Sequence, residues 1–254
     1  MNFTANDIAV GYNGNSVLET DALNVQSGKV YFLIGRNGAG KTTLLKSFCG
    51  LLPLINGQLR LNNNSLEDLS IHEKSKLFTF VRSSAHRVDH MKVWDYVAYG
   101  RMPYTGLLGR LNKEDVNIID RSLEQLGITD LSGRYLTRLS DGEFRKVQIA
   151  MALCQQTELL FIDEPTAHLD IAAKAELFHL FQKMAREMGK AMVISTHEVH
   201  AALEMSDKLW LINKGYLHSG LAKEMLASGM VDEVFGSDLV SFRKEGKIKI
   251  MKVV

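Results

Sequence analysis

The stretch from Gly35 to Thr42, GRNGAGKT, places glycines, a lysine and a hydroxyl at the spacing G-x-x-x-x-G-K-[ST]. Glycines let a backbone bend closely around a phosphate and turn its N–H groups toward the anion. A helix that begins near Lys41 would aim the positive end of its dipole at the same charge. We therefore expect Lys41 to reach the β- and γ-phosphates of a nucleotide and the Thr42 hydroxyl to ligate Mg²⁺.

Two adjacent carboxylates, Asp163 and Glu164, follow the apolar run LLFI. Asp163 is suited to hold Mg²⁺ directly or through water, and Glu164 to polarise a water molecule that attacks a phosphate. Alone, such a pair could equally cap the next helix. Combined with the glycine-rich loop, the pair predicts the two halves of a phosphate–metal site.

Short apolar runs must position these groups. Residues 30–34 precede the glycine-rich loop, residues 159–162 precede the carboxylates, and residues 191–194 precede Ser195-Thr196-His197. A wholly apolar run of this length is typical of a strand buried on both faces. Alternation of such strands with helices predicts an α/β fold with a mostly parallel sheet and reactive loops at the carboxyl ends of its strands.

The flanking segments have different patterns. Residues 7–12, 16–18 and 23–25 each indicate a short strand. The pattern is helical from about residue 89 to residue 153, and one helix there is expected to be capped by Asn112 and ended by Gly127. The last residues, SFRKEGKIKIMKVV, predict a hairpin that turns near residues 245–246.

Composition limits the classes of function. The chain has 254 residues and a formal net charge of +1, so the basic excess of a nucleic-acid binder is absent. Two cysteines, Cys49 and Cys154, lie in apolar helical patterns, which indicates packed thiols and a reducing compartment. No signal-peptide layout and no apolar run of about 18 residues is found, so we expect a cytoplasmic protein that reaches a membrane only through a partner.

Five motifs occur in a fixed order along the chain: GRNGAGKTT, LSDGE (139–143), LLFIDEP (159–165), AHLD (167–170) and STH (195–197). In this order they resemble the nucleotide-binding domains of ABC transporters over nearly the whole length. The resemblance implies a P-loop NTPase core with a mostly parallel sheet, an N-terminal antiparallel β-subdomain and an inserted helical subdomain. The implied division is 1–85 with 154–220 as the core, 86–153 as the helical subdomain with the signature motif LSDGE, and 221–254 as a C-terminal extension with a β-hairpin.

The resemblance also implies roles for single residues. Glu164 would be the general base, His197 the switch histidine at the γ-phosphate, and Lys41 the third catalytic group. Mg²⁺ would be held by Thr42 and Asp163. The residues expected to bind ATP are Tyr12, which stacks on adenine, and Asn37, Gly38, Ala39, Gly40, Lys41, Thr42, Thr43, Ser140, Gly142 and Asp170. The simpler alternatives are a half-buried strand tyrosine for Tyr12 and a satisfied core histidine for His197.

Ser140 and Gly142 would close over the ATP of the opposite subunit, and Asp170 would organise that site, so the resemblance implies a homodimer with two-fold symmetry. Asp141 stands where the family has a glycine and Glu143 where it has a glutamine. A carboxylate near phosphate is electrostatically unfavourable, so Asp141 is expected to point away from the nucleotide. Ser83 stands where the family has a glutamine that reaches Mg²⁺, and its shorter side chain would need a bridging water.

The segments VWDYVAYGRMPY and GLLGRLNKED, with TAHLD, resemble importers of iron–siderophore complexes, haem and cobalamin. This resemblance implies membrane permease partners, an indirectly associated substrate-binding protein, and a position on the inner face of the cell membrane. Two alternatives stay open: a soluble ABC ATPase without a permease, and a regulatory module that binds ATP without hydrolysing it. The presence of Lys41, Asp163, Glu164 and His197 argues against the second alternative.

Overall fold

The computed structural model describes residues 1–83, 86–106, 108–167, 169–236, 243–244 and 247–248. Within them, ten strands form one mixed sheet in the order β5-β4-β1-β2-β10-β9-β3-β8-β7-β6. The strands are β1 (Asn2–Tyr12), β2 (Asn15–Gln26), β3 (Val30–Ile34), β4 (Asn56–Leu61), β5 (Asn64–Ser65), β6 (Phe78–Val81), β7 (Leu159–Asp163), β8 (Ala191–Ser195), β9 (Lys208–Asn213) and β10 (Tyr216–Gly220).

Five strands, β9, β3, β8, β7 and β6, are parallel to one another and form the centre of the molecule. Every residue of β3, β7 and β8 is buried, because helices or a second layer of strands cover both faces of the sheet. The faces alternate along β3: Phe32 contacts Phe178 at 5.6 Å between ring centroids, and Tyr31 contacts Trp210 at 5.6 Å on the other side. The predicted α/β fold with a mostly parallel sheet is confirmed.

The N-terminal strands β1, β2, β4 and β5 pair antiparallel. The prediction of two separate strands at 16–18 and 23–25 is wrong, since β2 is continuous from Asn15 to Gln26. The polar residues between those runs continue the alternation, and Thr20 is buried, where its hydroxyl donates to the carbonyl of Leu217 at 3.0 Å. Because Thr20 has a buried hydrogen-bond partner, β2 continues through a polar stretch at which the hydrophobic pattern predicted a break.

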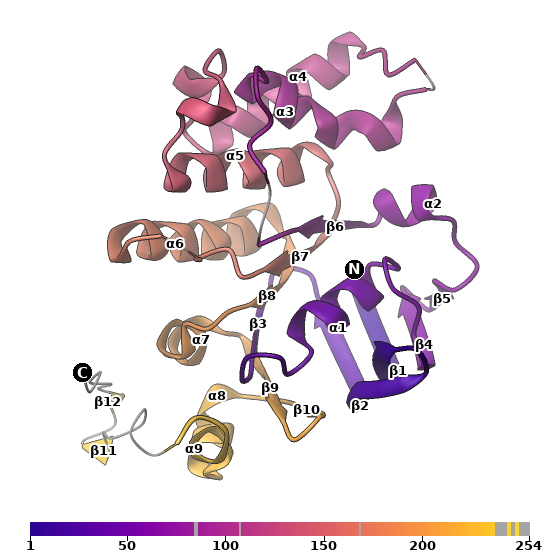
Figure 1. Ribbon diagram of the computed structural model, residues 1–254, viewed down its shortest axis with the longest axis vertical. Helices are drawn as coiled ribbons and strands as arrows, with labels where there is room; N and C mark the ends of the chain where they lie inside the picture. Colours follow the sequence, from indigo (N-terminus) through magenta and orange to yellow (C-terminus); the bar gives the residue numbers. More distant parts are fainter. Residues whose placement is uncertain (84–85, 107, 168, 237–242, 245–246, 249–254) are drawn as a thin grey trace.

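The helices fall into groups that Figure 1 shows at different heights. Helices α3, α4 and α5 pack together at one end of the molecule, and α6 lies between them and the parallel strands. The helices are α1 (Lys41–Phe48), α2 (Ile71–Ser75), α3 (Val93–Ala98), α4 (Lys113–Gln125), α5 (Asp141–Cys154), α6 (Ile171–Met188), α7 (Val199–Met205), α8 (Ala222–Ala227) and α9 (Met230–Phe235), with 3₁₀ turns η1 (Tyr99–Tyr104), η2 (Thr129–Leu131) and η3 (Leu136–Arg138).

The start of α4 shows how the helical group is fixed. Asn112 caps the helix as expected: its side chain accepts from the amide of Asp115 at 2.9 Å, and Asp115 accepts from the amide of Asn112 at 3.0 Å. Asp115 is buried and also forms an ion pair with Arg101 of η1 at 2.9 Å. Gly127, with a φ of 63°, follows the helix as predicted. One carboxylate thus joins the cap of α4 to η1.

Near the C-terminus, β11 (Arg243–Lys244) and β12 (Lys247–Ile248) pair antiparallel, as the predicted hairpin requires. The predicted turn residues 245–246 lie outside the described residues. Both cysteines are free; Cys154 is buried and Cys49 is half-buried. Among the described residues, none of the helices combines the length and the hydrophobicity needed to cross a membrane.

Candidate active site

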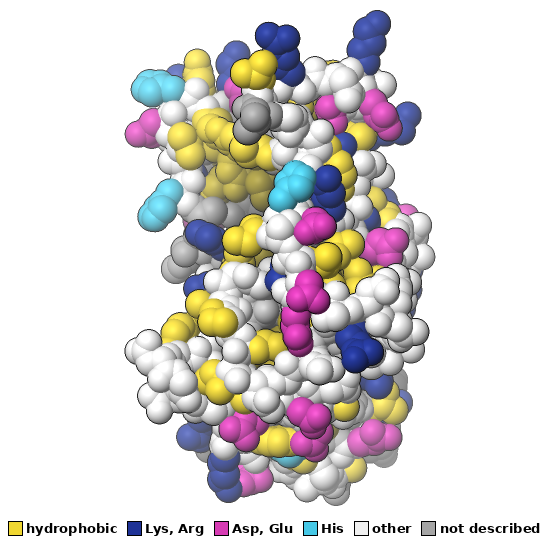
Figure 2. All heavy atoms as spheres, turned by 90° about the vertical axis from the view of Figure 1, so that its right-hand side faces the viewer, with side chains coloured by type: hydrophobic (Ala, Val, Ile, Leu, Met, Phe, Trp, Pro, Cys, Tyr) yellow, Lys and Arg dark blue, Asp and Glu magenta, His cyan; other side chains and the backbone are white. Residues whose placement is uncertain are grey.

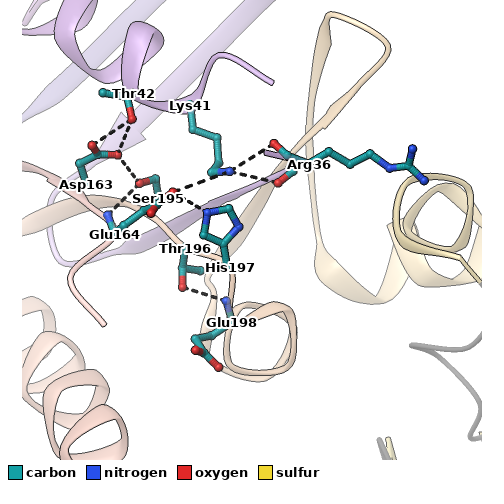
Figure 3. A network of polar contacts seen from close by, with 10 residues as sticks. Arg36, Lys41, Thr42, Asp163, Glu164, Ser195, Thr196, His197 and Glu198 are labelled. Carbon is teal, nitrogen blue, oxygen red and sulfur yellow. Dashed lines mark hydrogen bonds and ion pairs between the residues drawn. The ribbon is translucent and has the colours of Figure 1, made fainter. Parts of the chain in front are cut away.

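A cavity of about 590 Å³ opens where the loop after β3 meets the ends of β1, β7 and β8. Its polar network is drawn in Figure 3, in which Lys41, Thr42, Asp163, Glu164 and His197 converge from three separate strand ends. The lining residues are Tyr12, Val17, Asn37, Gly38, Ala39, Gly40, Lys41, Thr42, Thr43, Glu164 and His197. The topology explains the convergence, because β3, β8 and β7 are neighbours and parallel, so their carboxyl ends share one edge.

The glycine-rich loop has the backbone that its composition predicts. Gly38 and Gly40 have φ values of 75° and 97°, in the left-handed region that side chains disfavour. Gly40 also directly precedes α1, so the N–H groups of the first turn of that helix face the cavity. A loop with this shape offers backbone donors and a helix dipole to a bound phosphate.

Lys41 is buried at the first position of α1. Its ammonium donates to the carbonyls of Gly35 at 3.1 Å and Arg36 at 3.4 Å, and lies 3.9 Å from Oε1 of Glu164. Burial lowers the pKa of Lys41 below its usual value, and the charges of Glu164 and Asp163 act in the opposite direction. A partly desolvated cation at this place interacts more strongly with phosphate than an exposed one would.

Asp163 ends β7 and collects two hydroxyl donors. The hydroxyl of Thr42 lies 3.0 and 2.9 Å from its two carboxylate oxygens, and the hydroxyl of Ser195 donates to Oδ1 at 2.7 Å. Asp163 is itself buried. A carboxylate beside a threonine hydroxyl is an all-oxygen donor set of the kind that Mg²⁺ prefers, so Thr42 and Asp163 fit the predicted ion.

Glu164 has a φ of 44°, which is strained for a residue with a side chain. Its amide is held by Ser195, through the hydroxyl at 3.0 Å and the carbonyl at 3.1 Å. Its carboxylate lies 2.6 Å from Nε2 of His197. The turn therefore directs the Glu164 carboxylate into the cavity, between His197 and Lys41 (Figure 3).

Tyr12 ends β1 and brings the antiparallel strands to the cavity. Its hydroxyl is 3.1 Å from that of Thr43, and half of the residue, 50%, is exposed. An exposed ring fixed at its hydroxyl end offers a face on which a base can stack.

Three of the predicted nucleotide contacts lie elsewhere among the described residues. Ser140 caps α5, and its hydroxyl accepts from the amide of Glu143 at 3.2 Å. Gly142 lines a separate groove of about 230 Å³ between α5 and α6. Asp170 caps α6 by accepting from the amide of Ala173 at 2.8 Å. Within one copy of the chain, these residues are not part of the cavity.

Ser83 follows β6 and is also absent from the described residues that line the cavity. Its carbonyl accepts from Nη2 of Arg145 at 2.9 Å, while Nη1 of the same arginine donates to the carbonyl of Arg82 at 3.1 Å. The backbone at Ser83 is thus fixed to α5 by a buried arginine.

The sequence interpretation missed the role of Ser195 and the presence of Val17. Ser195 is fully buried and joins Asp163 to the backbone of Glu164, so it positions both carboxylates. The signal was present, because Ser195 ends a buried strand next to Thr196 and His197. Val17 belongs to β2, and only the pairing of β1 with β2 brings it to the cavity.

The arrangement suits the transfer of a phosphoryl group to water. The glycine loop, the start of α1 and Lys41 can hold a triphosphate, and Thr42 with Asp163 can hold a divalent cation beside it. Glu164 presents a carboxylate at hydrogen-bond distance from His197, as an oriented general base requires. The groups that nucleotide hydrolysis requires therefore line this cavity or, like Asp163, contact a residue that lines it.

Comparisons with known proteins agree with this geometry. The family model described as "ABC transporter" matches residues 18–167. The chain is 32% identical to the iron(3+)-hydroxamate import ATP-binding protein FhuC of Bacillus subtilis, over 91% of this chain and 86% of FhuC. It is 34% identical to the petrobactin import ATP-binding protein FatE of Bacillus anthracis, over 87% and 84% of the two chains.

A third relative, the manganese transport system ATP-binding protein MntB of Listeria innocua, is 32% identical over 92% of each chain. Among solved structures, a nucleotide-free ATP-binding cassette from an ABC transporter aligns with a TM-score of 0.81 at 21% identity, over 91% of this chain and 96% of the other. The ADP conformation of the cassette MJ1267 aligns with a TM-score of 0.80 at 24% identity, over 92% and 98%. These two structures are similar to the chain in fold.

Proposed function

Because the chain belongs to the ABC transporter family as an ATP-binding subunit with ATPase activity, we propose that it works as a homodimer that energises an importer of iron–siderophore complexes. The observation that carries the proposal is that Lys41, Thr42 and Glu164 line one cavity, with Asp163 beside Thr42 at hydrogen-bond distance. The implied membrane partner is a permease, on whose cytoplasmic side the dimer would sit.

The names of the relatives support the choice of cargo. Of the metal chelates that the sequence suggests, which are iron–siderophore complexes, haem and cobalamin, the first is favoured by relatives named for hydroxamate, petrobactin and achromobactin. Manganese is a second candidate, because MntB is as similar in identity as FhuC. The cargo would be delivered to the permease by a substrate-binding protein.

Each residue of the cavity has a defined part in the proposed hydrolysis. The loop amides and Lys41 bind the β- and γ-phosphates, and Tyr12 stacks on the adenine. Glu164 takes a proton from the attacking water, and His197, 2.6 Å from its carboxylate, orients it and contacts the γ-phosphate as the switch histidine. Mg²⁺ held by Thr42 and Asp163 would neutralise charge on the phosphates. Catalysis would rest on positioning and charge stabilisation, since phosphoryl transfer needs little covalent help.

The proposed dimer is supported by three predicted ATP contacts that do not line the cavity of the same copy. Ser140 and Gly142 belong to the signature motif but lie at the start of α5, and Asp170 lies at the start of α6. A two-fold related copy could bring the start of its α5 to the ATP held here, and the same contact would then form in reverse. We accordingly retain Ser140, Gly142 and Asp170 as residues of the opposite site.

We further propose the division into a core (1–85 and 154–220), a helical subdomain (86–153) and a C-terminal extension (221–254). The position of α3, α4 and α5 at one end of the molecule supports a separate helical subdomain at residues 86–153. Ser83 is retained as a contact to Mg²⁺ through water. Its fixed backbone supports this role, because only the short side chain would need to be extended by a water molecule.

The first test is the variant Glu164→Gln, which keeps the shape of the side chain and removes its basicity. We expect turnover of ATP to fall about 10²- to 10⁴-fold, the usual contribution of a general base. ATP should then accumulate in a stable dimer, seen by light scattering as twice the 28.4 kDa mass of the chain. Lys41→Ala should stay monomeric with ATP. Unchanged turnover in Glu164→Gln would remove Glu164 from the proposed role.

The second test is affinity purification of the tagged chain from detergent-solubilised native membranes, with mass spectrometry of the proteins that copurify. A stoichiometric membrane protein with many helices is the expected result, and the binding protein encoded with it would define the cargo. Recovery of soluble partners alone would instead favour a soluble ABC ATPase without a permease.

A further inference from the structure

Residues 140–143 at the start of α5, here called the signature turn, form an ion pair that the sequence motif does not reveal. Nη2 of Arg87 lies 2.5 Å from Oδ1 of Asp141, the residue between Ser140 and Gly142. Arg87 comes from the segment between β6 and α3, 54 residues earlier in the chain. Its guanidinium also stands over the ring of Phe144, 5.3 Å from the centroid. The arginine thus contacts both the first residue of α5 and the next turn of the same helix.

Charge explains why such a contact matters at this place. Asp141 is largely exposed, with 64% of its side chain accessible, on a turn that the proposed dimer brings to a triphosphate. An uncompensated carboxylate there would repel the phosphates and oppose the attraction of the helix dipole for an anion. The second carboxylate of the turn, Glu143, is also compensated: it accepts from the amide of Ser140 at 2.7 Å and lies 3.5 Å from Arg134.

A second contact also joins the described part of the segment after β6 to α5. Arg145, one turn beyond Asp141, donates to the carbonyls of Arg82 and Ser83 and is buried. The segment after β6 is therefore held to α5 through its backbone, at residues 82–83, and through the Arg87 side chain.

We propose that Arg87 is a positioning residue that neutralises Asp141 and so allows a signature turn with an extra carboxylate to close on the ATP of a second copy. The inference rests on the proposed function, in which Ser140 and Gly142 act across the dimer. It differs from the expectation drawn from the sequence that Asp141 only points away. Its charge is compensated by a partner that is distant in the sequence.

The test is a double-mutant cycle of Arg87→Ala and Asp141→Asn, with KM for ATP and kcat measured for each variant. Arg87→Ala should raise KM about three- to tenfold, as expected for one uncompensated charge near a polyanion in water. In the double variant R87A/D141N, KM should return to within about twofold of D141N alone. The increase in KM should shrink at about 1 M salt, because exposed charges are then screened within about 3 Å.

Further variants separate charge from structure. Arg87→Lys keeps the charge and should keep KM within about twofold of the wild-type value, while Arg87→Gln should resemble Arg87→Ala. Arg121→Ala is the matched control, because it removes an exposed arginine of α4 that lies outside the site. A KM in R87A equal to that of R121A, or a raised KM that D141N does not rescue, would overturn the inference.

The two levels of the proposal fail differently. If the wild-type chain showed no ATP turnover, or if Gly142→Asp were as active as wild type, the role of the signature turn would be lost and this inference with it. If Gly142→Asp abolished turnover while D141N failed to rescue R87A, the signature turn would act as proposed and the inference alone would be wrong.

Discussion

Glu164 is held in a left-handed conformation by a serine whose own side chain is fully buried. The hydroxyl of Ser195 accepts from the Glu164 amide and donates to Asp163, so one oxygen fixes the backbone of one carboxylate and the side chain of another. The strained φ of 44° at Glu164 persists because these contacts determine it from both sides. At the scale of single residues, the geometry of the cavity therefore depends on Ser195 as well as on the groups that meet the nucleotide.

Ser195→Ala should show this dependence. Loss of the hydroxyl leaves buried polar groups with fewer partners, which costs about 1–3 kcal/mol of unfolding free energy. Turnover of ATP should fall as well, because Asp163 and Glu164 lose a shared support. Urea unfolding and steady-state ATPase assays measure the two effects.

The matched control is Ser47→Ala in α1. Ser47 is also buried, but its hydroxyl has no hydrogen-bond partner among the described residues. Replacement by alanine should change stability by no more than about 0.5 kcal/mol or increase it, because alanine favours a helix and no hydrogen bond is lost. Equal destabilisation in both variants would contradict the role given to Ser195.

At the scale of elements, the ion pair between Arg101 and Asp115 joins η1 to α4. Both side chains are almost fully buried, at 6% and 4% exposure, and Arg101 also donates to the carbonyl of Cys154 at the end of α5. Its guanidinium lies 4.1 Å from the ring centroid of Tyr104. One buried guanidinium thus connects three elements of the helical group.

Asp115→Asn should destabilise the chain by about 3 kcal/mol, because it leaves the Arg101 charge buried and unpaired. Lys183→Ala, which removes an exposed i, i+4 pair with Glu187 at 4.0 Å, is the control and should change stability by less than about 0.5 kcal/mol. Chemical unfolding of both variants measures the difference. Similarly small changes in unfolding free energy in the two variants would show that the buried ion pair stabilises the chain no more than an exposed one.

The same pair predicts a dependence on pH. The amide of Asn112, and then Arg101, lower the pKa of Asp115 below its usual value. A carboxyl with a depressed pKa in the folded state stabilises the fold above its unfolded pKa of about 4, and this contribution is lost as pH falls through the folded value. The difference in unfolding free energy between wild type and Asp115→Asn should therefore narrow below about pH 4.

The elements that sequence patterns indicate best are those determined by local composition. The apolar runs of β3, β7 and β8 predicted a parallel core, and Asn112 predicted the start of α4, because both signals lie within a few residues. The continuity of β2 and the pair Arg87–Asp141 depend on partners far along the chain. Spacing within a motif cannot encode such contacts, so only the folded chain shows them.

At the scale of the whole molecule, the antiparallel and parallel parts of the ten-stranded sheet are connected by few backbone pairs, between β2 and β10. Strands β2 and β10 share one registered pair, Glu19 with Tyr216, a hydrogen bond from the amide of Glu19 to the carbonyl of Gly215 at 2.9 Å, and the bond from the Thr20 hydroxyl to Leu217. Tyr12 reaches the cavity from the antiparallel side of this connection, and Lys41 from the parallel side. A bound nucleotide would span the two parts of the sheet.

The end of the molecule formed by α3, α4 and α5 carries several exposed apolar side chains, among them Tyr99, Met102 and Leu108. Figure 2 shows hydrophobic side chains gathered in a hollowed area in this upper part. Exposed apolar groups of this kind mark protein contacts, and the proposed permease is the partner that this family implies.

Met102→Glu should therefore reduce copurification of the permease severalfold while the isolated chain hydrolyses ATP as before. Met102 is 60% exposed, so the fold should tolerate the charge. Leu221→Glu, at the start of α8 near the opposite end of the molecule, serves as the control and should leave copurification unchanged. Equal loss in the two variants would exclude the helical end as the docking surface.

The order of the strands has a consequence for synthesis on the ribosome. β3 leaves the ribosome early, yet both of its partners, β8 and β9, begin at Ala191 and Lys208. At about 5–20 residues per second, a wholly apolar strand waits roughly ten to thirty seconds with both edges unpaired. Such edges are templates for aggregation, so we expect the nascent chain to need chaperone protection until β9 has emerged. A strand at the centre of the finished sheet thus stays unpaired for much of translation.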